Sequence, residues 1–416
     1  MSYYVIAVLG TFDSKGDEHL FLKERIEARE VGTVTVHTGT RAASPFPADY
    51  DLFREVVMGL PAGKRDRDQS IQAVLEAGRK LIRELHDRGE IQGVVSAGGG
   101  TGTHLATAIM RALPIGVPKV MVSTVASRDM SEVVGTRDVT MMHSVADILG
   151  VNSLLGPILD AAAGAVCGMA RITWTPRKGP RRIALTMFGF ITAAAGSVKT
   201  ELESMGYEVV AFHANGTGGM AMEELAAEGF FDGIMDLATH ELADELKGGY
   251  CRGIGPQRLA PAPGKPVPRL VVPGGLDCAV LEFTRETVPL EYQDRPVFFY
   301  DFRSAVRLTV DESLLIAEQV AEKLNLHPRG LRVLVPWGGW SEADGPDKPL
   351  WAPETSRALV NRLRRDLDPA IPLEECGFHI NDPAFAAKAA RAMHEMLQPV
   401  PIQKRFLGTG KFPIQK

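Results

Sequence analysis

The chain has 416 residues, a length that favours two domains over one. Hydrophobic residues make up 45% of it and charged residues 23%, as in ordinary soluble globular proteins. The formal net charge of −5 gives no electrostatic basis for binding nucleic acid or an anionic membrane. Neither a signal peptide nor an apolar run long enough to cross a bilayer is visible, so no membrane partner is expected.

The cysteines are far apart in the sequence and form no C-x-x-C pair. This spacing predicts neither a zinc site nor a disulfide framework. It fits a reduced, cytoplasmic protein. The four cysteines are Cys167, Cys251, Cys278 and Cys376.

An apolar first strand, Tyr3–Leu9, is followed by a polar loop, Gly10–Asp17, and by a helix over His19–Arg29. Ligands of open parallel sheets bind outside the carboxyl ends of the strands, so this loop is a candidate ligand site. The structural alternative is a helix start that Asp17 caps. The candidate ligand groups of the loop belong to Gly10, Thr11, Asp13 and Lys15.

After a second strand at Val34–Thr38, the apolar strand Ile91–Ser96 leads into a glycine-rich loop, and a helix is expected over His104–Ala112. Backbone N–H groups of such a loop point at an anion, and the helix N-terminus adds about half a positive charge. Glycine lets the backbone approach a phosphate closely and take a positive φ. A tight turn without a ligand is the alternative, but four glycines and two threonines in six residues exceed what a turn requires. The predicted anion site is Gly98, Gly99, Gly100, Thr101, Gly102 and Thr103.

Other parts of the first half support this site. The expected strand Pro118–Thr124 ends in the hydroxyls of Ser123 and Thr124, which are further candidate ligand groups. The amphipathic helix Gln69–Arg88 precedes the glycine strand, and the charge run Lys64–Asp68 before it is interpreted as a solvated face.

The middle of the chain predicts a domain boundary. The helix Asn152–Arg171 is rich in alanine and glycine, which allows close packing, including against a second copy of the chain. The proline, glycine and basic residues of Trp174–Arg182 then indicate a linker. We therefore predict an N-terminal domain over residues 1–180 and a C-terminal domain over residues 181–416.

Strands and helices alternate again in the second half, which predicts a second doubly wound sheet. The fold class is thus α/β, with two doubly wound Rossmann-like domains whose mainly parallel sheets face a central cleft. Expected strands are Arg182–Phe188, Tyr207–His213, Phe231–Leu237, Leu270–Val272, Val297–Tyr300 and Leu331–Pro336. Expected helices include Ile191–Met205, Glu312–Leu324, Glu354–Leu367 and Pro383–Leu397.

Several loops after these strands carry side chains suited to acid–base catalysis or metal binding. In two facing domains the carboxyl ends of both sheets line one cleft, so these side chains are expected to converge there. Taken singly, each histidine is more readily explained as a hydrogen-bonded structural residue. The catalytic candidates are His213, His240, Glu241, Asp277 and His379.

Motif searches narrow the choice of function. No G-x-x-x-x-G-K-[ST] motif occurs, which excludes a P-loop NTPase, and no G-x-S-x-G motif supports a serine hydrolase. Residues Gly216–Ala221 match G-x-G-x-x-[GA], and Asp236 follows twenty residues after Gly216. A lone match of this kind is weak evidence for a dinucleotide site.

Five motifs occur in one order along nearly the whole chain: GTFDSK at Gly10–Lys15, SAGGGTGT at Ser96–Thr103, HANGTGGMAME at His213–Glu223, DLATHE at Asp236–Glu241 and PGGLD at Pro273–Asp277. With them the chain resembles the tomato mosaic virus resistance protein-like ATP-binding family. That family is largely uncharacterised and widespread in bacteria and fungi. In its plant branch this unit is fused to a TIM-barrel-like unit, and the present chain resembles the stand-alone bacterial type.

The resemblance implies an ATP-binding N-terminal domain, a second α/β domain and a homodimer. By matching motif, the nucleotide phosphates would lie on Gly98–Thr103, with Gly10, Thr11, Asp13 and Lys15 nearby. Lys15 would offset phosphate charge, and Asp13 would hold Mg²⁺. The resemblance implies no reaction.

Three functions therefore stay open from the sequence. The first is an ATP-binding protein, either an enzyme or a protein regulated by ATP. The second is an ATP-independent enzyme for a small anionic metabolite, with His213, His240 and Glu241 as acid–base groups. The third is a non-catalytic binding module in which ATP stabilises a dimer that engages another macromolecule.

Overall fold

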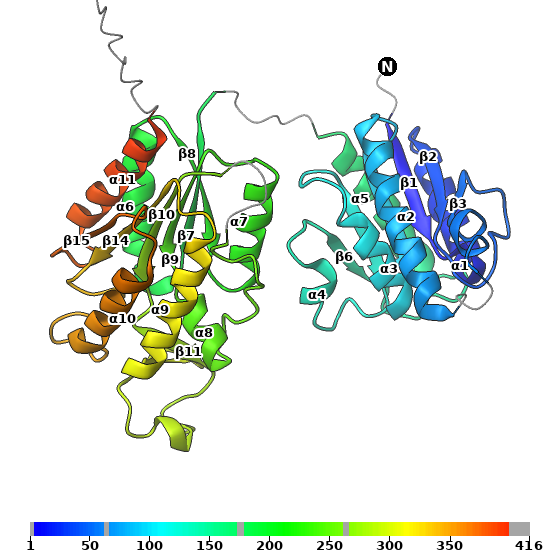
Figure 1. Ribbon diagram of the computed structural model, residues 1–416. Coiled ribbons are helices and arrows are strands. Elements are labelled where there is room, and N and C mark those ends of the chain that lie inside the picture. Colours follow the sequence, from blue (N-terminus) through cyan, green and yellow to red (C-terminus); the bar gives the residue numbers. More distant parts are fainter. Residues whose placement is uncertain (1–3, 62–65, 173–178, 261–265, 399–416) are drawn as a thin grey trace, which may run out of the picture. The chain divides into compact units, whose positions relative to one another are not determined.

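The computed structural model describes residues 4–61, 66–172, 179–260 and 266–398, and the chain divides into two compact units, Met1–Pro176 and Arg177–Lys416. The predicted linker lies partly outside the described residues. Each unit contains a six-stranded parallel sheet with helices on both faces (Figure 1). The predicted α/β class with two Rossmann-like domains is confirmed.

The N-terminal sheet has the strand order β3-β2-β1-β4-β5-β6. Its strands are β1 (Val5–Gly10), β2 (Gly32–His37), β3 (Tyr50–Asp51), β4 (Gly93–Gly98), β5 (Lys119–Ser123) and β6 (Thr140–His143). The helices are α1 (Phe12–Glu27), α2 (Arg67–Asp87), α3 (Gly100–Met110), α4 (Ser131–Val134) and α5 (Leu155–Ala170), with a π-helical turn at Phe53–Val57.

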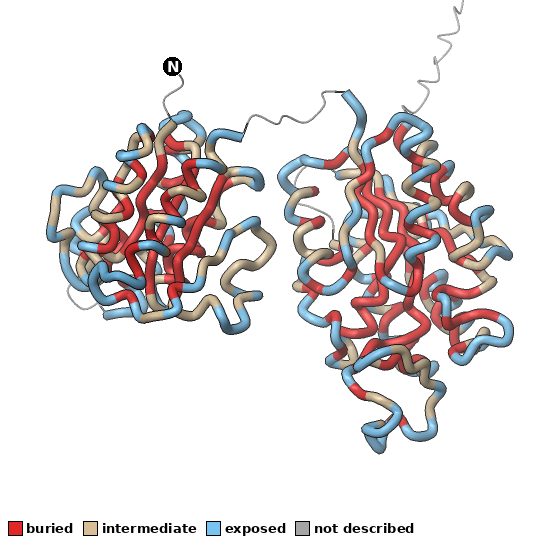
Figure 2. The backbone as a smooth tube through the Cα atoms, turned by 180° about the vertical axis from the view of Figure 1, so that it is seen from behind, coloured by how far each residue is buried: buried red, intermediate tan, exposed pale blue. Residues whose placement is uncertain are grey.

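The core of this domain lies on both faces of the sheet, because successive side chains of a strand point to opposite faces. Ile6 and Val8 of β1 pack beneath α1 and α5, whereas Ala7 and Leu9 pack beneath α2 and α3. Figure 2 shows the buried strands at the centre of each domain. Gly164 of α5 faces another part of the same chain, since a Cβ there would lie 3.6 Å from Nε of Arg29 in the segment after α1. Packing of this helix against a second copy of the chain stays a prediction.

Two helices begin earlier than the sequence predicts. Helix α1 begins at Phe12, whose side chain is buried against Phe46 and His37, and it is kinked at Lys15, which has non-helical backbone angles (φ −137°, ψ 40°). Asp17 lies inside the helix after this kink and does not cap it. Helix α3 begins at Gly100, inside the glycine run that was expected to be a loop.

The C-terminal sheet has the strand order β15-β14-β10-β9-β7-β8. Its strands are β7 (Arg182–Met187), β8 (Glu208–His213), β9 (Gly233–Ala238), β10 (Arg269–Gly274), β14 (Leu331–Pro336) and β15 (Leu373–Cys376). The helices are α6 (Thr192–Ser204), α7 (Thr217–Ala227), α8 (Glu241–Lys247), α9 (Val310–Asn325), α10 (Pro353–Asp366) and α11 (Pro383–Leu397), with 3₁₀ turns at Gly189–Ile191 and Leu290–Tyr292.

A small antiparallel sheet is inserted between β10 and α9, and the sequence reasoning missed it. It consists of β11 (Cys278–Leu281), β12 (Val297–Phe299) and β13 (Ser304–Arg307), in the order β11-β13-β12. The segment predicted as a strand at Val297–Tyr300 therefore belongs to this sheet and not to the parallel one. Aromatic side chains pack on it, with the rings of Phe283 and Tyr292 stacked at 5.9 Å.

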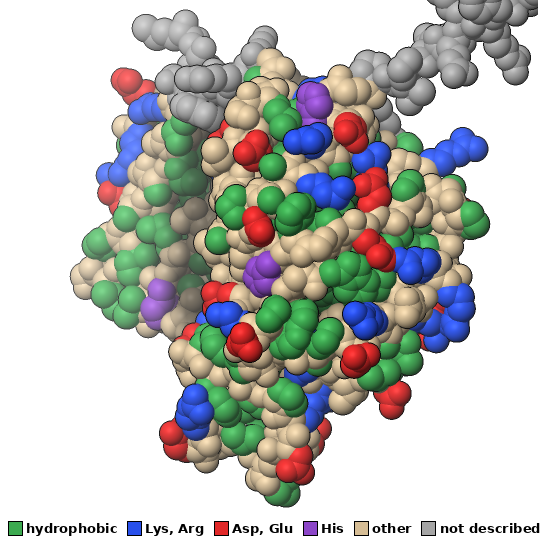
Figure 3. All heavy atoms as spheres, turned by 90° about the vertical axis from the view of Figure 1, so that its left-hand side faces the viewer, with side chains coloured by type: hydrophobic (Ala, Val, Ile, Leu, Met, Phe, Trp, Pro, Cys, Tyr) green, Lys and Arg blue, Asp and Glu red, His purple; other side chains and the backbone are tan. Residues whose placement is uncertain are grey.

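No helix among the described residues is long and apolar enough to cross a membrane. On the face in Figure 3, acidic and basic side chains of the described residues are interspersed. This face shows no stripe of one charge sign of the kind that binds nucleic acid phosphates.

Candidate functional site

The strand order of the N-terminal sheet creates a switch point between β1 and β4. Strands β1 and β4 are neighbours, and the chain after β1 continues to β2 on one side, whereas the chain after β4 continues to β5 on the other. Helix α1 follows β1 on one face of the sheet, and α3 follows β4 on the opposite face. A crevice forms where two such connections separate, and open α/β sheets bind their ligands in that crevice.

A pocket of about 240 Å³ lies at this switch point. The two segments chosen from the sequence meet there, since Oγ1 of Thr11 lies 3.9 Å from where a Cβ at Gly102 would be. The pocket is lined by Thr11, Asp13, Ser14, Lys15, Thr40, Arg41, Arg67, Gly99, Gly100, Thr101 and Gly102.

The N-terminus of α3 faces this pocket with backbone N–H groups that lack a hydrogen-bond partner within the described part of the chain. No described side chain caps the helix, whose first intrahelical bond runs from N–H of Thr103 to the carbonyl of Gly99 (2.8 Å). The N–H groups of Gly100, Thr101 and Gly102 therefore have no intrahelical partner. Together with the helix dipole, they make the pocket suitable for an anion.

The glycines of this turn serve two purposes, and neither is the positive φ that the sequence suggested, because all of them have ordinary φ values. A Cβ at Gly98 would lie 3.1 Å from Cα of Gly102, so the strand and the helix approach too closely for side chains. A Cβ at Gly100 would meet no atom within 4 Å. Packing thus explains Gly98 but not Gly100, whose missing side chain leaves the pocket open.

Among the residues that the structure describes, three basic side chains and one carboxylate line the pocket: Lys15, Arg41, Arg67 and Asp13. The ammonium of Lys15 donates to the carbonyl of Ile148, and Nη2 of Arg67 lies 3.4 Å from Oγ1 of Thr101. The sequence reasoning missed Arg41 and Arg67. The charge run Lys64–Asp68 contained the signal for Arg67, but nothing in it indicated that α2 would place this residue beside α3.

Asp13 has a structural role that the sequence did not predict. Its Oδ2 accepts hydrogen bonds from the backbone N–H groups of Arg41 (3.1 Å) and Ala42 (3.4 Å). The carboxylate thereby holds the segment that carries Arg41 against the pocket. Its proposed role as a Mg²⁺ ligand stays a prediction.

Two buried histidines, His19 and His37, contact the backbone of the pocket loops. Neither was predicted from the sequence. His19 Nδ1 lies 2.6 Å from the carbonyl of Lys15, and its Nε2 accepts from N–H of Ala97 (3.3 Å), which fixes a neutral ring. Burial lowers the pKa of His19. His37 Nδ1 accepts from N–H of Phe12 (3.0 Å), and its Nε2 lies 3.0 Å from the carbonyl of Ala42.

The other predicted N-terminal residues lie behind the pocket wall. Ser123 and Thr103 are buried, and their hydroxyls are 2.7 Å apart. The hydroxyl of Thr124 lies 3.8 Å from where a Cβ at Gly99 would be. The contact between the Ser123 and Thr103 hydroxyls holds β5 against the start of α3, and neither these residues nor Thr124 are among the described residues that line the pocket.

The five candidates of the C-terminal domain all follow carboxyl ends of its parallel strands, as predicted. His213 ends β8, His240 and Glu241 follow β9, Asp277 follows β10, and His379 follows β15. His213 is exposed, whereas His240, Glu241 and Asp277 are buried.

Most of these side chains are engaged in the protein interior. Glu241 pairs with Arg258 and accepts from N–H of Gly216 (2.9 Å), and Asp277 accepts from the hydroxyl of Ser341 (2.8 Å). His379 Nε2 lies 3.0 Å from the carbonyls of Ser341 and Asp344. Their catalytic roles stay predictions.

The possible dinucleotide motif at Gly216–Ala221 lacks an accessible acidic partner. Asp236 is fully buried and pairs with Arg258 (2.6 Å) and Arg269 (3.5 Å). A ribose hydroxyl therefore cannot reach the carboxylate that this motif requires.

His240 differs from the other candidates because neither ring nitrogen has a hydrogen-bond partner among the described residues, although the side chain is buried. Its ring stacks on Phe188 with centroids 3.9 Å apart. Burial lowers the pKa of His240 to about 3, and the neighbouring His213 and Arg258 act in the same direction. The ring is therefore neutral at physiological pH.

This low pKa predicts acid sensitivity. Between about pH 6.5 and 3, the unfolded chain binds a proton at residue 240 that the folded chain excludes. The contribution of His240 to the free energy of unfolding is complete above pH 6.5 and is lost at about 1.4 kcal/mol per pH unit as pH falls. Urea titrations of the wild type and of His240→Gln measure this effect, both with a chelator so that no bound metal ion contributes. The free energies of unfolding of the two proteins should diverge as pH falls through this window. Parallel curves would contradict the neutral buried ring.

Comparison with known proteins identifies the family. Residues 4–175 match the N-terminal domain of the uncharacterised protein family UPF0261, and residues 180–397 match its C-terminal domain. A UPF0261 protein of Clostridium tetani is 35% identical over 402 residues, which cover 94% of this chain and 99% of that protein. A UPF0261 protein of Rhizobium meliloti is 35% identical over 404 residues, which cover 95% and 99%.

A plant protein is also similar to the chain. The ToMV susceptible protein tm-1(GCR26) of Solanum lycopersicum is 32% identical over 418 residues, which cover 93% of this chain and 55% of that protein. The relationship that the five sequence motifs suggested is thereby confirmed at the level of the family. The chain belongs to the uncharacterised protein family UPF0261, whose homologues include the tomato Tm-1 resistance proteins.

Proposed function

We propose that the N-terminal domain binds a phosphate-bearing nucleotide at the β1–β4 switch point, with ATP as the first candidate and Mg²⁺ as its companion. The observation that carries the proposal is the combination of free helix N–H groups and basic side chains around one pocket. Lys15, Arg41 and Arg67 give three positive charges against the one negative charge of Asp13. A multiply charged anion is the ligand class that this balance favours.

The polar lining suggests how a nucleotide would lie. Glycine, hydroxyl and charged groups line the pocket, and no aromatic side chain is among the described residues of this lining. The phosphates would therefore occupy the pocket, next to Gly100 and Thr101, and the base would extend beyond it. The resemblance noted in the sequence is the reason to test ATP before other phosphate esters.

The test compares two glycine variants. Gly100→Val should abolish ATP binding, because the new side chain would project into the pocket without touching protein atoms within 4 Å of its Cβ. Gly168→Val is the matched control, since Gly168 also lies in a helix of this domain with nothing within 4 Å of a Cβ. In thermal-shift experiments, ATP at 100 times its Kd should add about 2.7 kcal/mol to the free energy of unfolding of the wild type and of the control. It should add nothing to that of Gly100→Val. Far-UV circular dichroism should be unchanged in both variants.

Further ligands decide which part of the nucleotide is recognised. Pyrophosphate should compete with ATP, whereas adenosine should not, because the lining has charge but no aromatic platform. Unaltered ATP affinity in Gly100→Val, or competition by adenosine alone, would refute the placement of phosphates on α3. The homodimer implied by the resemblance stays a prediction.

A further inference from the structure

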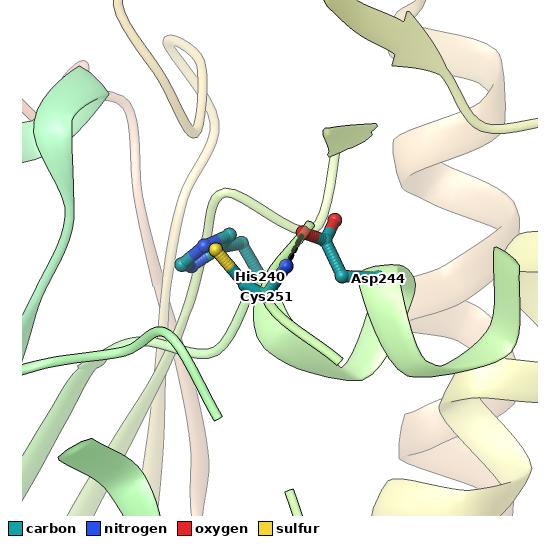
Figure 4. Close-up of side chains that lie close together, drawn as sticks. All are labelled: His240, Asp244 and Cys251. Carbon is teal, nitrogen blue, oxygen red and sulfur yellow. Dashed lines mark hydrogen bonds between the residues drawn. The ribbon is translucent and has the colours of Figure 1, made fainter. Parts of the chain in front are cut away.

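A second site is suggested by three buried side chains of the C-terminal domain that offer a nitrogen, an oxygen and a sulfur to one point. One ligand atom each from His240, Asp244 and Cys251 lies within 4.8 Å of the other two (Figure 4). We propose that these three residues hold a divalent transition-metal ion, with Zn²⁺ as the preferred species. This site is separate from the nucleotide pocket and does not depend on it.

The local fold brings the three residues together. His240 immediately precedes α8, and Asp244 lies four residues later, so their side chains share one side of the helix. Gly248, in the left-handed conformation, ends α8, and the chain turns back so that Cys251 comes beside the helix start. A Cβ at Gly249 would lie 2.8 Å from Cγ of Asp244, so this return requires glycine.

Backbone donors orient the carboxylate of Asp244. Its Oδ2 accepts from N–H of Cys251 (2.8 Å), which is the dashed bond in Figure 4, and its Oδ1 accepts from N–H of Val280 (2.7 Å). Each oxygen retains a second lone pair for a metal ion. Ligating carboxylates in metal sites are commonly held by such outer hydrogen bonds.

His240 is the independent sign of a missing ligand. Both ring nitrogens are buried without a hydrogen-bond partner among the described residues, and Phe188 holds the ring by stacking. An unsatisfied buried polar group is costly and requires an explanation. A metal ion bound to one ring nitrogen would explain why that nitrogen has no hydrogen-bond partner.

The charge balance favours an ion at this point. A divalent ion beside one thiolate and one carboxylate forms a neutral cluster with the neutral imidazole. Binding then releases the thiol proton of Cys251, and the carboxyl proton of Asp244 where it is present, to solvent.

The donor set selects the metal. Imidazole and thiolate favour Zn²⁺ over Mg²⁺ and Ca²⁺, which take oxygen ligands. Three protein ligands leave the fourth position for water or another ligand, as in catalytic zinc sites. The spacing His-x₃-Asp-x₆-Cys differs from the paired cysteines that mark zinc sites in a sequence, so His240 was a candidate from the sequence whereas Asp244 and Cys251 were not.

Cobalt substitution tests the proposal on the full chain. After chelator treatment, added Co²⁺ should bind one ion per chain and produce a thiolate-to-cobalt charge-transfer band, which Zn²⁺ should then remove by displacement. Cys251→Ala should lose this band, and its Zn²⁺ affinity should fall by about 100-fold or more, since loss of an outer-shell contact alone costs ~10–100-fold. Asp244→Asn should keep a thiolate band but bind Co²⁺ more weakly.

Cys167→Ala is the matched control, because Cys167 is a buried cysteine of the other domain. It should keep the wild-type band and affinity. Absence of a charge-transfer band in wild-type protein at saturating Co²⁺ would overturn the proposal, and this result needs no variant to fold. Wild-type Zn²⁺ affinity in Cys251→Ala would overturn it as well.

Discussion

Replacing Arg258 with alanine is expected to lower the free energy of unfolding by about 3–5 kcal/mol, the cost of leaving buried carboxylates without their partner. Arg258 is buried and pairs with Glu223 (3.2 Å), Asp236 (2.6 Å) and Glu241. Arg269 contacts two of the same carboxylates, Glu223 and Asp236. In the variant, Glu223 and Asp236 would keep Arg269 as a partner, whereas the buried Glu241 would lose its ion pair with Arg258.

The direction of the pKa shifts supports this expectation. Burial alone would lower the pKa of Arg258, but Asp236, Glu241 and Glu223 raise it above its ordinary value. Burial raises the pKa of Glu241, and Arg258 counteracts this effect. Without Arg258, Glu241 is expected to take up a proton. The N–H of Gly216 would then no longer donate to a charged carboxylate.

Urea denaturation followed by circular dichroism measures the effect. Arg365→Ala is the control, because Arg365 is exposed and pairs only with its chain neighbour Asp366 among the interactions of the described residues, so no measurable change is expected. A loss below about 1 kcal/mol in Arg258→Ala would show that the buried network is not tightly coupled.

Replacing Gly10 with alanine should cost about 3 kcal/mol or more, through overpacking and through loss of two buried hydrogen bonds. The new Cβ would lie 2.0 Å from Nε2 of His19, which is 1% exposed and has no space to retreat. Displacing His19 would break its contacts with the carbonyl of Lys15 and the N–H of Ala97. Because these contacts fix both pocket loops, ATP stabilisation should disappear with the lost stability.

Gly100→Ala is the control for Gly10→Ala. It tests whether a side chain added at any glycine of the pocket loops lowers the free energy of unfolding. A Cβ at Gly100 meets nothing within 4 Å, so the stability of that variant should equal or slightly exceed that of the wild type. Thermal unfolding with and without ATP measures both variants. Wild-type stability in Gly10→Ala would contradict the support of the pocket by His19.

The sequence predicted the parts of the fold that depend on local pattern. Apolar β-branched runs marked β1, β4 and β5, and periodic apolar residues marked α2, α9 and α10, because these patterns follow from strand and helix geometry. It did not predict β11 and β13, whose short segments are stabilised by pairing across the antiparallel sheet.

The residues of the candidate site were likewise predicted only in part. Glycine-rich and polar loops after strands were recognised because parallel strands place their carboxyl ends together. Arg41, Arg67, His19 and His37 were not, because their contacts join residues up to 78 positions apart in the chain. His240 was a candidate from the sequence, but its convergence with Asp244 and Cys251 was not predicted, because it depends on the turn after α8.

The sequence by itself determined that the protein is α/β, where its main strands and helices lie and which two glycine-containing segments follow apolar strands; that these strands are neighbours was decided by the tertiary structure. The tertiary structure alone decided which charges surround the pocket, that α3 begins inside the glycine run and that Glu241 and Asp236 are buried partners of Arg258. The physical reason is the range of the forces involved. Periodicity is a property of adjacent residues, whereas ion pairs, burial and metal-ligand geometry depend on atoms that only the folded chain brings together.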